Sequence, residues 1–278
     1  MPKVSILIPT HNRAENIGIA VNSALTQTEQ DVEVIVYDDG SDEMDGFFEK
    51  KGKITKVSPP TDVVLGKIKD PRLSYVKCKI NHGPAYSRNQ LMEMATGEYS
   101  MWLDSDDVSN HWRVELCLKA MNMYGGAYIR SAITTFGKDV GNTWMVPPML
   151  VHRGGVSFAT IMFPTENHIK FDTSYKHCCE DMDWELRYAA KYGRSTYIPL
   201  TLYGVGRKAQ DRLTMRSKVK SNKNDYEADK KRYAGKADRI IKAMKAAGKT
   251  KFPKTVPWSF IEEHTKPLFN KTYKTQVS

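Results

Sequence analysis

Short apolar runs alternate with amphipathic segments along the first half of the chain, and this alternation predicts the order of strands and helices. Five apolar runs predict strands: residues 4–9, 32–37, 73–77, 98–103 and 127–136. Three segments with apolar positions on one side predict helices: residues 14–25, 84–95 and 110–124. Strands that alternate with helices through short connections are typical of an α/β fold with a mostly parallel sheet.

Local signals add detail to this pattern. Asn12 followed by Glu15 predicts a capping box at the start of the first helix, and Asn110 is expected to cap the third. Residues 43–70 are mostly polar and contain two consecutive prolines. We therefore expect residues 52–65 to form a mobile insertion.

Polar clusters follow three of the predicted strands, at residues 10–13, 38–42 and 104–107. Ligands bind outside the carboxyl ends of strands in such sheets, so these clusters should converge on one edge. The third cluster, Asp104-Ser105-Asp106-Asp107, holds three carboxylates that raise one another's pKa. A divalent cation removes that cost, which favours a metal–diphosphate site. The alternative is a solvated turn that caps the next helix.

The composition is that of a globular protein without a membrane span. Of the 278 residues, 40% are hydrophobic and 27% are charged. No apolar run approaches the roughly 20 residues that a membrane helix needs, and the N-terminus enters a strand without the pattern of a signal peptide. The four cysteines lack Cys-x-x-Cys spacing, so we expect reduced thiols and a cytoplasmic location.

Positive charge is concentrated in the last quarter of the chain. Residues 205–278 carry 20 Lys and Arg against 7 Asp and Glu, a net charge of +13, whereas residues 1–204 carry a net charge of −3. This asymmetry predicts an acidic partner such as nucleic acid, a membrane surface or an anionic polymer. The alternative is a solvated helix with surplus lysines. Beyond residue 215 the pattern is helical and is broken by Pro253 and Pro257, and the apolar last twenty residues should dock on the body.

Four segments resemble, in the same order, the motifs of family 2 glycosyltransferases, which have the nucleotide-sugar-binding GT-A fold. They are VSILIPTHNR at 4–13, VIVYDDGS at 34–41, the stretch from NHGPAYSRN at 81–89 to LDSDD at 103–107, and EDMDWELR at 180–187. The similarity covers about residues 3–215.

The resemblance implies a Rossmann-like, mostly parallel central sheet flanked by helices. A GT-A domain would span residues 1–214, with a nucleotide-binding half at 1–107 and an acceptor and catalytic-base half at 108–214. Residues 215–278 would form a basic, mainly helical C-terminal extension. The implied activity is metal-dependent, inverting transfer of a sugar from a nucleotide diphosphate donor to a hydroxyl acceptor.

The resemblance also assigns roles to residues of this chain. Asp106 would hold Mn²⁺ or Mg²⁺, with Asp104 or Asp107 as its partner, although Asp107 is equally an anchor for the next helix. Asp181 would be the general base with Glu180 beside it; the alternative is acidic charge that complements the helix dipole. Eight residues would contact the nucleotide sugar: Pro9, Thr10, Asn12, Arg13, Asp39, Arg88, Asp104 and Ser105.

Two questions remain open at the level of sequence. The His that the family often carries after the strand following the acidic helix is absent, so Arg207 or Lys208 would contact the diphosphate instead. The basic extension suggests an acidic acceptor, such as modified DNA or a surface polysaccharide. The alternative function is a nucleic-acid-binding module on a GT-A-like scaffold that uses this extension.

Five residues are candidate acceptor or sugar contacts: Trp144, Met145, His152, Arg153 and Phe158.

Overall fold

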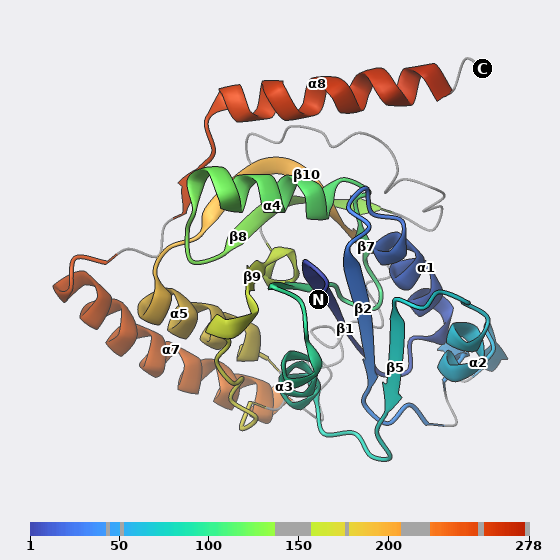
Figure 1. Ribbon diagram of the computed structural model, residues 1–278. Coiled ribbons are helices and arrows are strands. Elements are labelled where there is room, and N and C mark those ends of the chain that lie inside the picture. The colour runs from blue at the N-terminus through green and yellow to red at the C-terminus, as the bar shows by residue number, and fades with distance from the viewer. Residues whose placement is uncertain are drawn as a thin grey trace.

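A computed structural model describes residues 1–42, 45–50, 53–136, 157–175, 178–206, 223–249 and 253–275. Within these residues, a nine-stranded sheet runs through the molecule in the order β11-β10-β8-β9-β6-β1-β2-β5, with β7 paired to β10. Helices cover both faces of the sheet (Figure 1). The predicted α/β class with a flanked central sheet is therefore confirmed.

Four parallel strands build the N-terminal part of the sheet. They are β1 (Val4–Thr10), β2 (Val32–Asp38), β5 (Leu73–Lys77) and β6 (Tyr99–Trp102). β1 lies in the centre, with Val4 opposite Val32 on one side and Tyr99 on the other. All four had been predicted to within two residues, because each is an apolar run bounded by polar turns.

The rest of the sheet mixes directions. β8 (Ile129–Phe136) and β10 (Thr196–Gly206) are parallel, and β11 (Lys254–Thr255) continues beside β10. β9 (Met162–Pro164) joins the two halves and is antiparallel to both β6 and β8. β7 (Val108–Ser109) is antiparallel to β10 and brings the chain after β6 against that strand.

Alternate residues of the central strands supply two separate cores. Ile6, Ile8 and Val34 pack with α1 (Ala14–Leu25), α2 (Thr61–Gly66), α4 (Arg113–Tyr124) and the start of α8 (Trp258–Thr275). Leu7 and Ile35 face the other way, toward α3 (Pro84–Met94), α5 (Glu180–Tyr192) and α7 (Lys223–Ala246). This two-residue alternation is the expected consequence of strand geometry. Short 3₁₀ turns at Phe158–Thr160 and Thr165–Asn167 flank β9.

The predicted capping box is wrong, and part of the predicted insertion has regular secondary structure. No capping box forms at α1, because the Asn12 side chain binds Asp42 across the neighbouring loop instead. The predicted insertion at residues 52–65 contains β4 (Lys53–Lys56), which pairs with β3 (Phe47–Lys50) before it, and most of α2. α2 packs against α1, and the buried Asp45 carboxylate accepts hydrogen bonds from the backbone N–H groups of Ala14 and Thr61.

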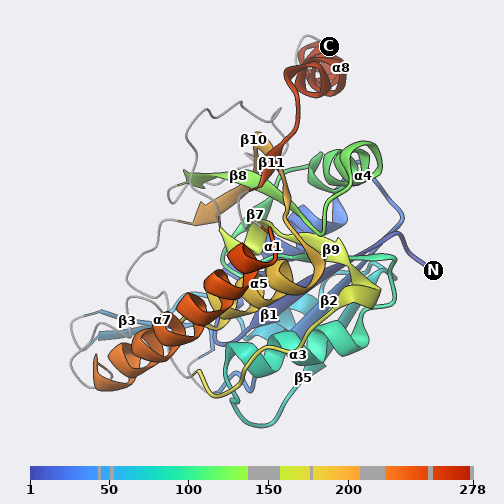
Figure 2. The ribbon, with the colours of Figure 1, turned by 90° about the vertical axis from the view of Figure 1, so that its left-hand side faces the viewer.

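The basic extension forms two helices with different positions. α7 lies along α5, as both ribbon views show (Figures 1 and 2). α8 begins against α4, where the rings of Phe260 and Tyr124 meet with centroids 5.5 Å apart. Docking of the C-terminal segment is thus confirmed for Phe260 and Ile261, whereas the Trp258 side chain is 55% exposed. None of the described helices combines the length and the apolar character that a membrane crossing requires. The predicted domain boundary at residue 214 lies outside the described residues.

Candidate functional site

The loops after β1 and β2 are locked together by one side chain. Asn12 has a left-handed backbone (φ 51°), and its N–H donates to Ser41 Oγ at 2.8 Å. Its side-chain amide donates to Asp42 Oδ1 and accepts from the Asp42 N–H, both at 3.0 Å. The polar clusters at 10–13 and 38–42 therefore converge as predicted, with Asn12 as their cross-link.

Asp39 lies buried at the junction between β2 and α3. One carboxylate oxygen accepts the His82 N–H at 3.0 Å and the other accepts the Gly83 N–H at 2.7 Å. Asp39 therefore fixes the start of α3, and its predicted contact with the nucleotide sugar stays a prediction. Beside it, Thr10 Oγ1 is buried and has no hydrogen-bond partner among the described residues. A buried hydroxyl without a hydrogen-bond partner is costly.

Arg88 on α3 joins the two acidic clusters. Its Nη1 donates to Glu180 Oε1 at 2.9 Å, and its Nη2 lies 3.6 Å from Asp104 Oδ1. The guanidinium also lies over the rings of Phe158 and Phe171, 5.3 and 5.7 Å from their centroids. The structure therefore pairs Arg88 with two carboxylates.

The turn after β6 contains one anchored carboxylate and two more accessible ones. Asp107 is 5% exposed, and its oxygens accept the Tyr203 hydroxyl and the Gly206 N–H, each at 2.9 Å. Tyr203 Oη also accepts the Asp104 N–H at 3.1 Å, so β10 holds both ends of the turn. The side chains of Asp104 and Asp106 are 35% and 25% exposed, with Asp106 4.0 Å from Arg13 Nε.

The exposure and contacts of these three carboxylates indicate which of them suit a metal ion. Two accessible carboxylates fit Mg²⁺ or Mn²⁺, which commonly use one or two protein carboxylates and complete their shell with water and phosphate oxygens. The hydrogen bonds of Asp107 fit an anchor, although it anchors the turn to β10 and not to the next helix. Within the described residues, no three His, Cys, Asp or Glu side chains form a metal cluster by themselves. Ser105 is buried within the same turn.

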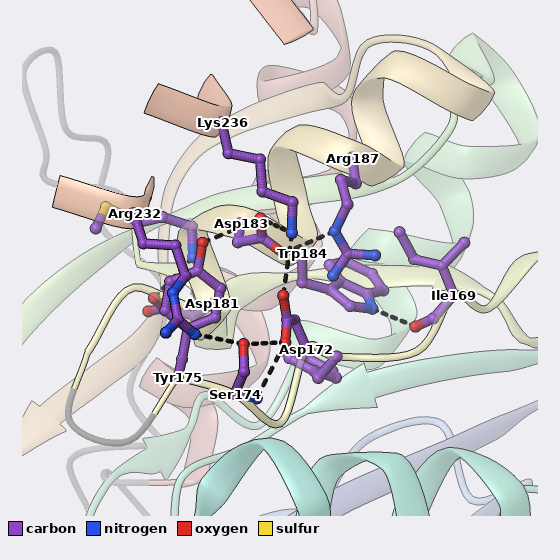
Figure 3. A network of polar contacts seen from close by, with 12 residues as sticks. Ile169, Asp172, Ser174, Tyr175, Asp181, Asp183, Trp184, Arg187, Arg232 and Lys236 are labelled. Atoms are coloured by element: carbon purple, nitrogen blue, oxygen red, sulfur yellow. Dashed lines mark hydrogen bonds and ion pairs between the residues drawn. The ribbon is translucent and has the colours of Figure 1, made fainter. Parts of the chain in front are cut away.

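The acidic start of α5 also combines anchored carboxylates with a more accessible one (Figure 3). Glu180 is buried against Arg88; burial raises its pKa, Asp181 raises it further, and Arg88 opposes both. Asp183 is 1% exposed and pairs with Arg187 Nε at 2.7 Å and Lys236 Nζ at 2.8 Å. Asp181 is partly exposed and accepts its neighbour's N–H at 2.7 Å, without an ion pair in the described chain. Of the three, Asp181 has the geometry of an available base.

Some predicted contacts cannot be placed, and others were missed. The candidates Arg207, Lys208, Trp144, Met145, His152 and Arg153 lie outside the described residues. Phe158 is buried among Trp102, Phe171 and Trp184, which assigns it to the core. Sequence reasoning missed Tyr203 as a partner of Asp107 and Lys236 as a partner of Asp183. Both lie more than 50 positions from their partners, and no local motif marks them.

The profile of the family described as Glycosyl transferase family 2 matches residues 5–191. A GT-A-like sheet with acidic turns at its carboxyl edge defines the class of protein, and the match covers more than half of the sequence. The chain belongs to glycosyl transferase family 2. The predicted family is therefore confirmed, and with it the predicted class of glycosyltransferase.

Related proteins share parts of the chain. The Escherichia coli enzyme UDP-Glc:alpha-D-GlcNAc-diphosphoundecaprenol beta-1,3-glucosyltransferase WfaP is 31% identical, over 49% of this chain and 51% of its own. An uncharacterised glycosyltransferase of Rickettsia bellii is 38% identical over 43% of this chain. That match spans only 15% of the Rickettsia protein, and the WfaP match spans about half of WfaP.

Solved structures show the fold. The S. aureus protein TarS (residues 1–349), in complex with UDP-GlcNAc, superposes with a TM-score of 0.59 at 18% identity, over 76% of this chain and 60% of TarS. The mannosyltransferase PcManGT from Pyrobaculum calidifontis, in complex with GDP-Man and Mn²⁺, gives a TM-score of 0.50 at 18% identity, over 70% of this chain and 54% of PcManGT. These similarities confirm the GT-A architecture of the sheet and its flanking helices.

Proposed function

We propose that this chain is a metal-dependent, inverting glycosyltransferase that moves a sugar from a nucleotide diphosphate donor to a hydroxyl acceptor. The observation that carries the proposal is the pair of acidic clusters, one after β6 and one at the start of α5, that Arg88 joins. One cluster suits a diphosphate and its metal, and the other supplies a base. The solved neighbours in complex with UDP-GlcNAc and with GDP-Man and Mn²⁺ support a donor of this kind.

The donor would lie along the carboxyl edge of β1, β2 and β6. The unpartnered Thr10 hydroxyl and the Asp39 carboxylate would contact the base and ribose, with Pro9 and Asn12 shaping the loop. Asp104 and Asp106 would hold Mn²⁺ or Mg²⁺, which neutralises the leaving diphosphate. Arg13, close to Asp106, would lie next to the same phosphates.

Asp181 would remove the proton of the acceptor hydroxyl as that oxygen attacks the anomeric carbon. A single displacement inverts the configuration and needs one base on the face opposite the leaving group. Glu180 suits this role less well, because its carboxylate is buried in the pair with Arg88. The Arg88 pair instead keeps the α5 cluster at a fixed distance from the Asp104 turn.

The donor is tested by thermal melting with UDP, GDP and their sugars, each with and without Mn²⁺ or Mg²⁺. A ligand that binds only the folded state raises the melting temperature by mass action, by about 2.7 kcal/mol of stability at a hundredfold excess over Kd. We expect one nucleotide to raise the melting temperature only in the presence of the metal. The absence of a shift with every nucleotide and metal would count against the donor and the metal together.

For the acceptor, we propose a hydroxyl of an anionic glycan or polymer. The support is the positive C-terminal charge and the name of WfaP, whose acceptor carries a diphosphate group. The test compares transfer to a diphosphate-linked GlcNAc lipid, to DNA with hydroxymethylated bases and to neutral disaccharides. Equal or faster transfer to the neutral sugars would contradict an anionic acceptor, and tight, salt-sensitive DNA binding without transfer would favour the nucleic-acid-binding alternative.

A further inference from the structure

Two ion pairs connect α7 to the acidic start of α5 and to the segment before it (Figure 3). Lys236 Nζ lies 2.8 Å from Asp183 Oδ1 and 3.2 Å from Asp172 Oδ2. Asp172 belongs to the segment before α5, and Asp183 belongs to the first turn of α5 itself. One ammonium group from the basic extension thus joins both sides of the short segment that leads into the helix.

Other contacts from the same side of α7 reach the same segment. Arg232 Nη1 donates to Ser174 Oγ at 2.5 Å, and Asp229 Oδ2 accepts the Cys178 N–H at 3.4 Å. The buried thiols of Cys178 and Cys179 pack with two α7 side chains, Tyr226 and Tyr233. Contacts therefore extend along α7 from Tyr226 to Lys236.

The charge at this junction explains why a lysine is needed there. Asp183 is 1% exposed, and a buried carboxylate is tolerated only when it is paired and hydrogen-bonded. Arg187 contacts Oδ2, whereas Lys236 contacts Oδ1. Without Lys236, one oxygen of this buried carboxylate would keep, among the described residues, the Tyr175 hydroxyl alone, 3.4 Å away. The first turn of α5 would then gain by moving toward water.

Asp181 lies on this first turn, two residues before Asp183. Cys179, directly before the helix, has a left-handed backbone (φ 73°) that a non-glycine residue adopts only where its surroundings hold it. Arg88 on α3 contacts Glu180, and Lys236 on α7 contacts Asp183. The backbone around Asp181 is therefore held between α3 and α7.

We propose that α7 is a brace for the catalytic turn and that Lys236 is a positioning residue for Asp181. This inference rests on the proposed function, because it takes Asp181 as the base. Part of the positive charge of the extension then holds the acidic segment of the same chain in place. Lys236 and Arg232 face the chain's own acidic segment, whereas Lys242 is exposed and pairs with Asp238 on its own helix, 2.9 Å away.

The test replaces Lys236 with methionine, which keeps much of the length of the side chain and removes the charge. Because a misplacement of about 1 Å can cost on the order of a hundredfold in rate, we expect kcat to fall between about tenfold and a hundredfold. The KM for the donor and its metal-dependent thermal shift should stay within about twofold, since the nucleotide edge is untouched. Lys236→Arg should recover most of kcat, and the matched control Lys242→Met should behave like the parent protein.

A second readout does not depend on activity. The thiols of Cys178 and Cys179 lie under α7, so loosening of the brace should speed their alkylation, as followed by mass spectrometry of the peptide. Cys117 lies in the other core and serves as the internal control for global unfolding. We expect faster alkylation of Cys178 and Cys179 in Lys236→Met, with Cys117 still protected.

The outcomes separate the brace from the proposed function. Normal kcat in Lys236→Met overturns the positioning role, whether or not the thiols become reactive. Loss of kcat with unchanged thiol protection also overturns it, because the rate then depends on the charge and not on the brace.

If Asp181→Asn keeps full turnover, the base assignment fails instead, while the thiol experiment still reports on α7. If Lys236→Met exposes Cys117 as well, Lys236→Arg decides: full kcat and protected thiols support the brace, and a loss of kcat in that well-folded variant contradicts it.

Discussion

The two acidic clusters of this molecule look alike in sequence and differ in how the fold treats each carboxylate. In the Asp104–Asp107 turn, a tyrosine and a backbone N–H of β10 engage Asp107, and Asp104 and Asp106 stay accessible. At the start of α5, Arg88 engages Glu180, a lysine of α7 engages Asp183, and Asp181 stays accessible. In each cluster, partners far away in the chain select which carboxylates remain for chemistry.

This comparison has a physical basis. Several carboxylates crowded together repel one another, so a protein can keep such a cluster ionised only by supplying counter-charges or hydrogen-bond donors. The buried acids, which have close protein donors, become structural anchors, and the more exposed acids can bind a cation or a proton. Variants of anchored and accessible members of the same cluster should therefore differ sharply.

The largest difference in activity between an accessible-site variant and an anchored-site variant is expected within α5. Asp181→Asn removes the proposed base without changing the shape of the side chain, and a positioned base contributes about 10²–10⁴-fold to rate. Turnover should fall by that amount while donor binding, followed by thermal shift, is retained. Asp183→Asn, in the anchored position, should lower stability first and activity less. A variant Asp181→Asn with parental kcat would remove Asp181 from the mechanism.

The second-largest difference in activity is expected between the variants of Asp106 and Asp107 in the turn after β6. Asp106→Asn weakens the proposed metal site, and a metal supplies several kcal/mol of stabilisation to the leaving group, or roughly 10²-fold in rate. We expect kcat/KM to fall and the Mn²⁺ concentration for half-maximal activity to rise. Asp107→Asn should instead lower the melting temperature with little change in that concentration. The reverse pattern would make Asp107 the ligand and Asp106 the anchor.

The sequence alone predicted β1, β2, β5, β6 and β8 and the three polar clusters, because strand periodicity and strand-end turns are local signals. Residues 10–13 and 38–42 do meet, as the parallel arrangement of β1 and β2 requires. The sequence could not separate anchored from accessible carboxylates, since that depends on contacts such as Tyr203 with Asp107, 96 positions apart. For the same reason, Lys236 looked like one of many surface lysines.

Tyr203→Phe tests the anchor of the first cluster directly. Its hydroxyl donates to Asp107 and accepts from the Asp104 N–H, and its ring lies 4.9 Å from the Arg113 guanidinium. The phenylalanine keeps the ring and removes the hydrogen bonds to Asp107 and to the Asp104 N–H, at a cost of about 1–3 kcal/mol. Chemical unfolding should show that loss, and kcat should fall about tenfold or less. Unchanged stability would mean that the other contacts of Asp107, including the Gly206 N–H, suffice to hold the turn.

The smallest expected effect is the pH dependence of the brace at Asp172. Burial alone would raise the pKa of this carboxyl, but hydrogen bonds from Ser174 and the Lys236 ammonium lower it to about 2. Because the folded-state pKa lies below the ordinary value of about 3.9, the contribution to stability is complete well above pH 4 and is lost as the pH falls toward 2. Asp172 is a third exposed, so screening limits this contribution to about 1 kcal/mol or less.

The measurement is the difference in unfolding free energy between the parent and Asp172→Asn, at pH 5 and again at pH 2.5. We expect the parent to be more stable at pH 5 and the difference to shrink at pH 2.5, where the parent carboxylate begins to take up a proton. A difference of the same size at both values would mean that the charge of Asp172 contributes nothing to the brace. Lys236 would then act on α5 through Asp183 alone, and the junction would resemble the Asp107 anchor, where one buried carboxylate carries the connection.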